Sequence, residues 1–181
     1  MRYMKFIKNI LFFEISTTGP DVDKDNVIQI SAVLLDKDNL LERANYNTFI
    51  RVSYLDSMIN EHAKLLNTDY ETLRRSPKIY EAVKNFREKF GNDLLLATHT
   101  LANLLFLKNA FRKAVVKYDY DAHVIELWTL GYIYTLNYGL KKMPTFNTFL
   151  DHFRLKMKNP VDALERVRLE AEIFRKIIKE V

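Results

Sequence analysis

Short apolar segments separated by polar turns open the chain. Residues 9–16 (NILFFEIS) are apolar and aromatic and end at the turn residues Thr-Thr-Gly-Pro, which predicts a buried strand. A second strand is expected over 26–36 (NVIQISAVLLD) and a third near 45–53 (NYNTFIRVS). The polar residues between these segments suit tight reversals. The pattern therefore predicts an antiparallel extension of the first strand.

Beyond these strands the apolar spacing becomes helical, interrupted by two further short apolar runs. Asn67 or Thr68 is expected to cap the first helix, and Gly91 is expected to end the second. Strands are expected over 94–100 and 123–128. Helices are expected over 68–76, 79–91, 101–115, 129–138, 144–155 and 161–181. Leading strands followed by alternating strands and helices predict an α/β domain with a mixed sheet flanked by helices.

Composition narrows the class of protein. The 181 residues fit a single domain over 1–181, and a net charge of +5 is compatible with a polyanionic partner without establishing one. The absence of cysteine excludes disulfides, thiolate metal sites and a cysteine nucleophile. The apolar run at 10–13 stops at Glu14, too short for a signal peptide, and no stretch is long enough to span a membrane. We expect a cytoplasmic protein without a membrane partner.

Four motifs occur in a recognisable order. They are FFEISTTG at 12–19, VIQISAV at 27–33, LLATHTLANLLFL at 95–107 and VDALERVRLEAEIF at 161–174. In order and spacing they resemble the DnaQ-like, or DEDD, 3′–5′ exonucleases, and the resemblance extends from Asn9 to the C-terminus. It implies a ribonuclease-H-like fold, with three leading antiparallel strands followed by parallel strands.

The same resemblance implies a chemistry. Such enzymes hydrolyse phosphodiesters with two divalent metals held by four carboxylates, because hard cations need several carboxylate oxygens. Two of these acids belong to the first strand, one to the helix after the fourth strand and one to the last helix, with a general-base His or Tyr just before it. The matching positions here hold, in that order, Glu14, Ser16, Asn103 and Arg166, with Val161 at the His position and Asp162 at the Tyr position.

Most of the carboxylates implied by the resemblance are therefore absent. No acid occurs anywhere between Leu94 and Lys108, so a shift of register cannot restore the third one. Arg166 would repel a divalent metal, because its guanidinium is a permanent cation. We expect Arg166 to replace the metal and to pair with Glu14, with an exposed Arg166 as the alternative.

Neighbouring acids offer only weak replacements. Asp162 either reaches the cleft or, as the favoured alternative, forms an i,i+4 ion pair with Arg166. Glu126 favours a structural or helix-capping role over a catalytic one. Asp21 and Asp23 are expected to be solvated turn residues.

Several residues remain candidates for contacts with nucleic acid. The resemblance places the backbone of Thr17 and Thr18 near a terminal nucleotide, and Lys141 and Lys142 could contact phosphates at the rim of the cleft. His99 either lines the cleft or is a hydrogen-bonded histidine at a strand end. The spacing of Phe146, Phe149 and Phe153 favours a core stripe over a base-stacking platform.

The sequence thus predicts an exonuclease-fold domain without metal-dependent hydrolysis. It would act as a nucleic-acid-associated binding or scaffolding module in replication, repair or RNA processing, with single-stranded DNA or RNA and a replication or repair protein as partners. No cofactor is expected. Two alternatives stay open: a divergent Mg- or Mn-dependent 3′–5′ exonuclease that recruits Asp162, Glu126 or Asp21, and a protein-interaction subunit.

Overall fold

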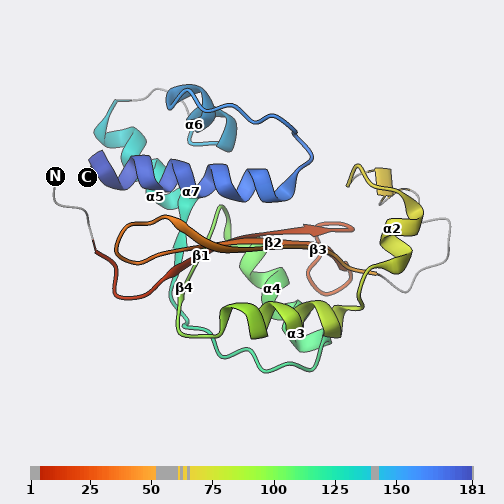
Figure 1. The fold of residues 1–181 in the computed structure, drawn as a ribbon. Coiled ribbons are helices and arrows are strands. Elements are labelled where there is room, and N and C mark those ends of the chain that lie inside the picture. Colours follow the sequence, from red (N-terminus) through yellow and green to blue (C-terminus); the bar gives the residue numbers. More distant parts are fainter. Residues whose placement is uncertain (1–4, 52–60, 62, 65, 140–142, 181) are drawn as a thin grey trace.

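The computed structural model describes residues 5–51, 61, 63–64, 66–139 and 143–180. Its centre is a five-stranded sheet in the order β3-β2-β1-β4-β5 (Figure 1). β1, β2 and β3 are antiparallel, and β4 and β5 continue parallel to β1. The strands are β1 (Ile10–Thr17), β2 (Val27–Leu35), β3 (Glu42–Phe49), β4 (Leu95–Thr98) and β5 (Val124–Glu126). The mixed sheet predicted from the sequence is confirmed.

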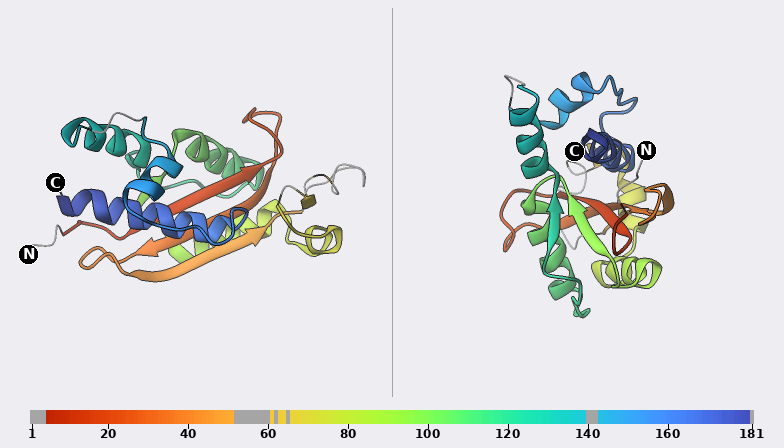
Figure 2. Two further views of the ribbon diagram at one scale, coloured as in Figure 1. Left: turned by 90° about the horizontal axis from the view of Figure 1, so that it is seen from above. Right: turned by 90° about the vertical axis from the view of Figure 1, so that its left-hand side faces the viewer.

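Helices cover both faces of this sheet (Figures 1 and 2). α3 (Ile79–Phe90) and α4 (Leu101–Lys113) pack on one face. α5 (Leu127–Asn137), α6 (Phe146–His152) and α7 (Ala163–Glu180) pack on the other. The short α2 (Tyr70–Arg75) lies beyond the end of β3. None of the helices described is long and apolar enough to cross a bilayer.

Alternation along β1 divides the apolar residues between the two faces. Leu11, Phe13 and Ile15 join the core beneath α3 and α4, whereas Ile10 and Phe12 join the core beneath α5, α6 and α7. Side chains on a strand alternate between faces, so Glu14 and Ser16 continue the second set. Glu14 and Ser16 thus belong to the face that α7 covers.

The segments predicted from the sequence all appear, with small differences at their ends. β3 spans Glu42–Phe49, so it begins earlier than the expected 45–53, and residues 52–53 of that prediction lie outside the described residues. The predicted cap of α2 at Asn67 or Thr68 is wrong. Asp69 is the cap, because its carboxylate accepts a 2.8 Å hydrogen bond from the Thr72 amide. Gly91 ends α3 as predicted, with a positive φ of 69° that favours glycine.

Candidate functional site

The carboxyl-terminal half of β1 forms one wall of the candidate site. Parallel pairing of β1 with β4 is confined to Ile10–Phe12, so the ladder ends before Glu14 is reached. Beyond that point, a side chain of α4 rather than the backbone of β4 pairs with β1. Oδ1 of Asn103 accepts a hydrogen bond from the Ile15 amide at 3.4 Å. Glu14 lies on the same face of β1 as Ile10 and Phe12, so its side chain faces α7.

An ion pair joins β1 to the first turn of α7. Nε of Arg166 lies 3.1 Å from Oε1 of Glu14, and the two side chains are 36% and 20% exposed. The contact predicted from the sequence is therefore present. The contact between Arg166 and Glu14 is electrostatic, because the direction of the Nε–H bond does not satisfy hydrogen-bond geometry.

A second carboxylate reaches the same guanidinium, and the sequence analysis missed it. Glu170 lies one turn after Arg166, with its Oε1 3.7 Å from Arg166 Nε, and it is completely buried. Its sequence signal is an acid within the apolar stripe of α7 formed by Val167, Ala171 and Phe174. An acid in such a stripe needs a buried partner, because an unpaired buried charge is costly.

These carboxylates keep unused acceptor capacity. Oε2 of Glu14 and both oxygens of Glu170 have no hydrogen-bond partner among the residues described. Burial raises the pKa of Glu14 to about 7, against the opposing effect of the Arg166 charge. Burial, and then the charge of Glu14, raise the pKa of Glu170 well above its usual value, although Arg166 lowers it. Two carboxyls thus share one guanidinium in a poorly solvated site.

Aromatic rings complete the surroundings of Arg166. Its guanidinium carbon lies 4.6 Å from the ring centre of Phe146, at the start of α6. The His99 ring makes an edge contact with Phe146 at 6.4 Å between centroids, and its buried Nδ1 has no hydrogen-bond partner among the described residues. Burial and the positive Arg166 lower the pKa of His99, partly offset by Glu126. His99 therefore faces this site as a neutral ring.

Phe146 and Phe149 are buried and Phe153 is partly buried, as a core stripe would be. Phe146 has the additional role of supporting the guanidinium. This contact is worth about 0.5–2 kcal/mol in general, depending on desolvation.

Asn103 and Ser16, which the resemblance matches to two carboxylate positions, act here as neutral hydrogen-bonding residues. Besides accepting from Ile15, Asn103 donates from Nδ2 to Thr98 Oγ1 at 3.0 Å. The Ser16 hydroxyl donates to Oε1 of Gln29 on β2 at 3.4 Å. Both side chains therefore connect β1 to its neighbours.

The neighbouring acids bind backbone amides. Asp162 accepts hydrogen bonds from the Leu164 and Glu165 amides at 2.9 and 3.0 Å, so it caps α7. The ion pair expected between Asp162 and Arg166 is replaced by this cap, because Arg166 turns to Glu14 and Glu170. Val161, which the resemblance matches to the position of the general-base His, is 42% exposed.

Glu126 and Asp21 have similar structural roles. Glu126 accepts from the Leu101 amide at the start of α4 at 3.3 Å, and also from the Thr129 hydroxyl. Asp21 accepts from the Asp23 and Lys24 amides in the turn after β1. The helix-capping role favoured for Glu126 and the turn role favoured for Asp21 are both observed.

The threonines after β1 are held within their own turn. The Thr17 hydroxyl donates to the Gly19 carbonyl at 2.7 Å, and the Thr18 hydroxyl donates to Asp25 at 3.0 Å. Their contact with nucleic acid stays a prediction. Lys141 and Lys142 lie outside the described residues.

The fold and this site define the class of protein. The sequence profile of the exonuclease family (RNase_T, described as Exonuclease) matches residues 13–159, so the chain belongs to the exonuclease family. The fold is shared with the nuclease domain of 3′hExo, a DEDDh family member bound to rAMP (TM-score 0.70, 14% identity, 97% of this chain and 94% of that chain). It is also shared with cell-death related nuclease 4, CRN-4 (TM-score 0.81, 13% identity, 96% and 64% covered).

Among curated proteins, the chain is similar to DNA polymerase III PolC-type of Bacillus subtilis. The two are 22% identical over 175 residues, which are 93% of this chain and 11% of the polymerase. The chain thus spans about a tenth of the length of the relative that it matches.

Proposed function

We propose that this chain is an exonuclease-fold domain without catalytic activity that associates with single-stranded DNA or RNA. The observation that carries the proposal is the position of Arg166, whose Nε lies 3.1 Å from Glu14 and 3.7 Å from Glu170. A fixed cation stands beside the one acid retained at the metal-binding positions. Arg166 would therefore supply the positive charge that a metal supplies in active relatives.

The donor set does not fit the two-metal centre that the family implies. Ser16 and Asn103 are neutral and already hydrogen-bonded to neighbouring groups. In the described ranges, no three or more His, Cys, Asp or Glu residues are grouped so that they could hold a metal ion. Mg²⁺ and Mn²⁺ prefer carboxylate, carbonyl and water oxygens, and a neighbouring guanidinium opposes their binding. We therefore expect no metal cofactor.

The position of the general base is also unsuitable for proton transfer. Val161 has no group that accepts a proton, and the adjacent Asp162 carboxylate is bound to the first amides of α7. A base that activates water must lie within hydrogen-bond reach of it with a free acceptor. Together with the metal-site residues, this supports loss of hydrolysis rather than a shifted centre built on Asp162.

Family membership and relatives support a nucleic-acid partner. The similar proteins include a nuclease domain bound to rAMP and a DNA polymerase. By analogy with these proteins, this chain would bind single-stranded nucleic acid. It would act in the cytoplasm as a scaffold beside replication, repair or RNA-processing proteins. The net charge of +5 favours such a polyanion.

A 3′-end trimming assay tests the loss of activity. Single-stranded DNA and RNA oligonucleotides labelled at the 5′ end would be incubated with the purified chain and excess Mg²⁺ or Mn²⁺. We expect no shortened products beyond those of a Glu14→Ala preparation. Trimming by the wild type that Glu14→Ala abolishes would overturn the proposal and favour the divergent nuclease.

A further inference from the structure

The segment between α6 and α7 carries a row of exposed cations. Arg154, Lys156 and Lys158 are exposed, whereas Leu155 and Met157 between them are partly buried. We propose that the three cations, here called the basic row, bind the phosphate backbone of single-stranded nucleic acid. The proposal rests on the nucleic-acid association argued above and assigns its surface.

Alternate side chains of this segment face opposite directions. Leu155 and Met157 pack against the core beneath α5, α6 and α7. Residues 155–157 form neither helix nor turn, and this alternation is that of an extended chain. In such a chain, alternate residues are about 7 Å apart, which is close to the separation of successive phosphates on an extended nucleic acid strand. The spacing of the basic row therefore suits a run of phosphates.

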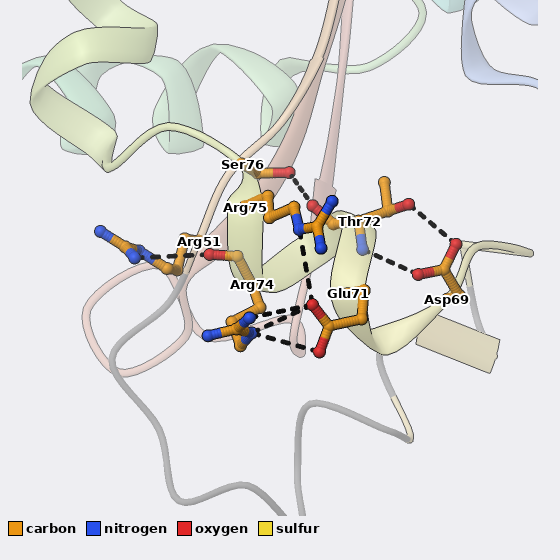
Figure 3. Close-up of polar contacts among 7 residues, drawn as sticks. All are labelled: Arg51, Asp69, Glu71, Thr72, Arg74, Arg75 and Ser76. Atoms are coloured by element: carbon orange, nitrogen blue, oxygen red, sulfur yellow. Dashed lines mark hydrogen bonds and ion pairs between the residues drawn. The ribbon is translucent and has the colours of Figure 1, made fainter.

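The side chains of the basic row are unpaired within the part of the chain that the structure describes. None of the three makes an ion pair or a side-chain hydrogen bond there. Outside the described ranges the sequence contains one acidic side chain, Asp56, and a single carboxylate cannot neutralise three cations. Exposed arginines elsewhere differ, since Arg74 and Arg75 of α2 lie 3.0 and 3.5 Å from Glu71 (Figure 3). The basic row is therefore available to an anionic ligand.

The acids on either side of the basic row do not pair with it. Asp151, in α6 before Arg154, makes no ion pair among the described residues. The Glu165 carboxylate accepts hydrogen bonds from the Lys158 and Asn159 amides at 2.8 and 2.9 Å, and these bonds fix the backbone at the end of the row. Side chains on an anchored backbone lose less conformational freedom on binding than those on a mobile loop. The basic row is thus partly preorganised for a ligand.

Arg154 has a backbone conformation that favours glycine. Its φ of 54° lies in the left-handed region, directly after α6. The Arg154 and Leu155 amides donate to the Asp151 and Leu150 carbonyls at 3.2 and 2.8 Å, which are the two hydrogen bonds of a helix end that usually carries glycine. A side chain in this region strains the backbone. An arginine here is unfavourable for folding, which supports a role for its side chain in binding.

The basic row is separate from the closed site. Figures 1 and 2 show the segment between α6 and α7, in blue, on the outer side of α7 and away from the sheet. Arg166 fills the site between α7 and β1, where it contacts Glu14. A strand bound along the basic row therefore needs no access to Glu14.

These side chains suit phosphate rather than bases. Arginine binds phosphate oxygens through two parallel hydrogen bonds and lysine binds them as a point charge, whereas base recognition needs groups directed at base edges. We therefore expect weak sequence preference and strong salt dependence. For single strands, the slope of log K against log salt changes by about 0.7 for each phosphate contact, so loss of three contacts reduces it by about 2.

Binding of a fluorescein-labelled oligothymidylate, followed by anisotropy across a KCl series, tests the proposal. The triple alanine variant of the basic row is compared with Lys24→Ala/Arg43→Ala/Lys84→Ala. The control also removes one arginine and two lysines, but from exposed side chains that each have an acidic partner. Circular dichroism melting shows that both variants fold.

We expect the row variant to bind about tenfold more weakly, with the smaller salt slope, and the control to bind like the wild type. A peptide nucleic acid of the same sequence, which lacks phosphates, should not bind.

The single variant Arg154→Gly separates binding from folding. Glycine relieves the backbone strain at this position, so the variant should melt at the same temperature as the wild type or higher, yet bind about threefold more weakly. A lower melting temperature, or unchanged binding, would contradict the proposal.

Equal weakening in both triple variants, or no weakening in the row variant, would overturn the basic row and leave the proposed association standing. Binding of the peptide nucleic acid would also overturn it. No binding by the wild type at low salt would instead refute the nucleic-acid association itself.

Discussion

Arg166 Nε and Glu14 Oε1 lie 3.1 Å apart and connect the first turn of α7 to the carboxyl-terminal half of β1. The resemblance implies that active members of this family hold divalent metals with acids at these two positions. In this chain the position on the last helix that the resemblance matches to one of these acids holds Arg166, which contacts Glu14 directly. Glu170, buried one turn later on α7, brings a second carboxyl group to the same guanidinium.

Removal of the arginine should destabilise the fold. Arg166→Ala leaves Glu14 and Glu170 without their cation, and breaking a fully buried pair costs about 3–5 kcal/mol. Because Arg166 is 36% exposed, we expect a smaller loss, on the order of 2 kcal/mol in the free energy of unfolding. Urea denaturation at neutral pH measures it.

Arg168→Ala is the matched control for this change. Arg168 lies on the same helix but pairs with Glu42 at the surface, where its side chain is 46% exposed. Surface pairs contribute about 0.2–1 kcal/mol. Equal losses in the two variants would show that Arg166 is an ordinary surface pair and contradict its proposed role.

Stability should fall as the pH rises through neutrality. The pKa of Glu14 is raised to about 7, and that of Glu170 is raised as well, from the ordinary value of 4.5. Between 4.5 and the raised pKa values, the folded state therefore binds protons that the unfolded state has lost. The contribution is fully present below about 4.5 and is lost as the pH rises through the folded pKa values. Each proton gives a slope of about 1.4 kcal/mol per pH unit.

Glu170→Gln should flatten this dependence and should be at least as stable as the wild type at alkaline pH. Glu42→Gln should instead be less stable than the wild type at neutral and alkaline pH. The hydrogen bond from Arg168 holds the pKa of Glu42 below its usual value, so its contribution is present above about 4.5 and is lost as the pH falls. Urea titrations at several pH values separate the two. A Glu170→Gln profile parallel to the wild type would contradict the raised pKa of Glu170.

Asn103 should protect one backbone amide of β1. Its Oδ1 accepts from the Ile15 amide beyond the point where pairing with β4 ends. Asn103→Ala should cost about 1 kcal/mol, because a neutral hydrogen bond contributes roughly that amount. Hydrogen exchange by NMR should show faster exchange at Ile15 and unchanged exchange in α3. Unchanged protection at Ile15 would contradict this role.

The sequence could predict the elements and the sheet because their signals are local. The apolar run of β1, the turn after it and Gly91 at the end of α3 indicate structure within a few residues. It also predicted the contact between Arg166 and Glu14, because the family motifs place both positions in one cleft. That inference needed the resemblance, since the residues are far apart along the chain.

Other contacts of the site could not be predicted from the sequence, because the spacing of residues along a helix does not give their distances to other elements. Asp162 and Arg166 share a helix face, yet Asp162 lies before the helix begins and caps it instead. Glu170 was missed because an acid within an apolar stripe indicates a buried partner without naming it.

Manganese binding tests the central claim most directly. If Arg166 takes the place of a metal, the wild type should not enhance the water-proton relaxation of Mn²⁺, whereas Arg166→Ala should bind Mn²⁺ between Glu14 and Glu170. Arg166→Met keeps an apolar stem against Phe146 and serves if the alanine variant is unstable. The double variant Arg166→Met/Glu170→Gln should lose the gained binding. Specific Mn²⁺ binding by the wild type that Glu14→Ala abolishes, or none by either Arg166 variant, would contradict the account.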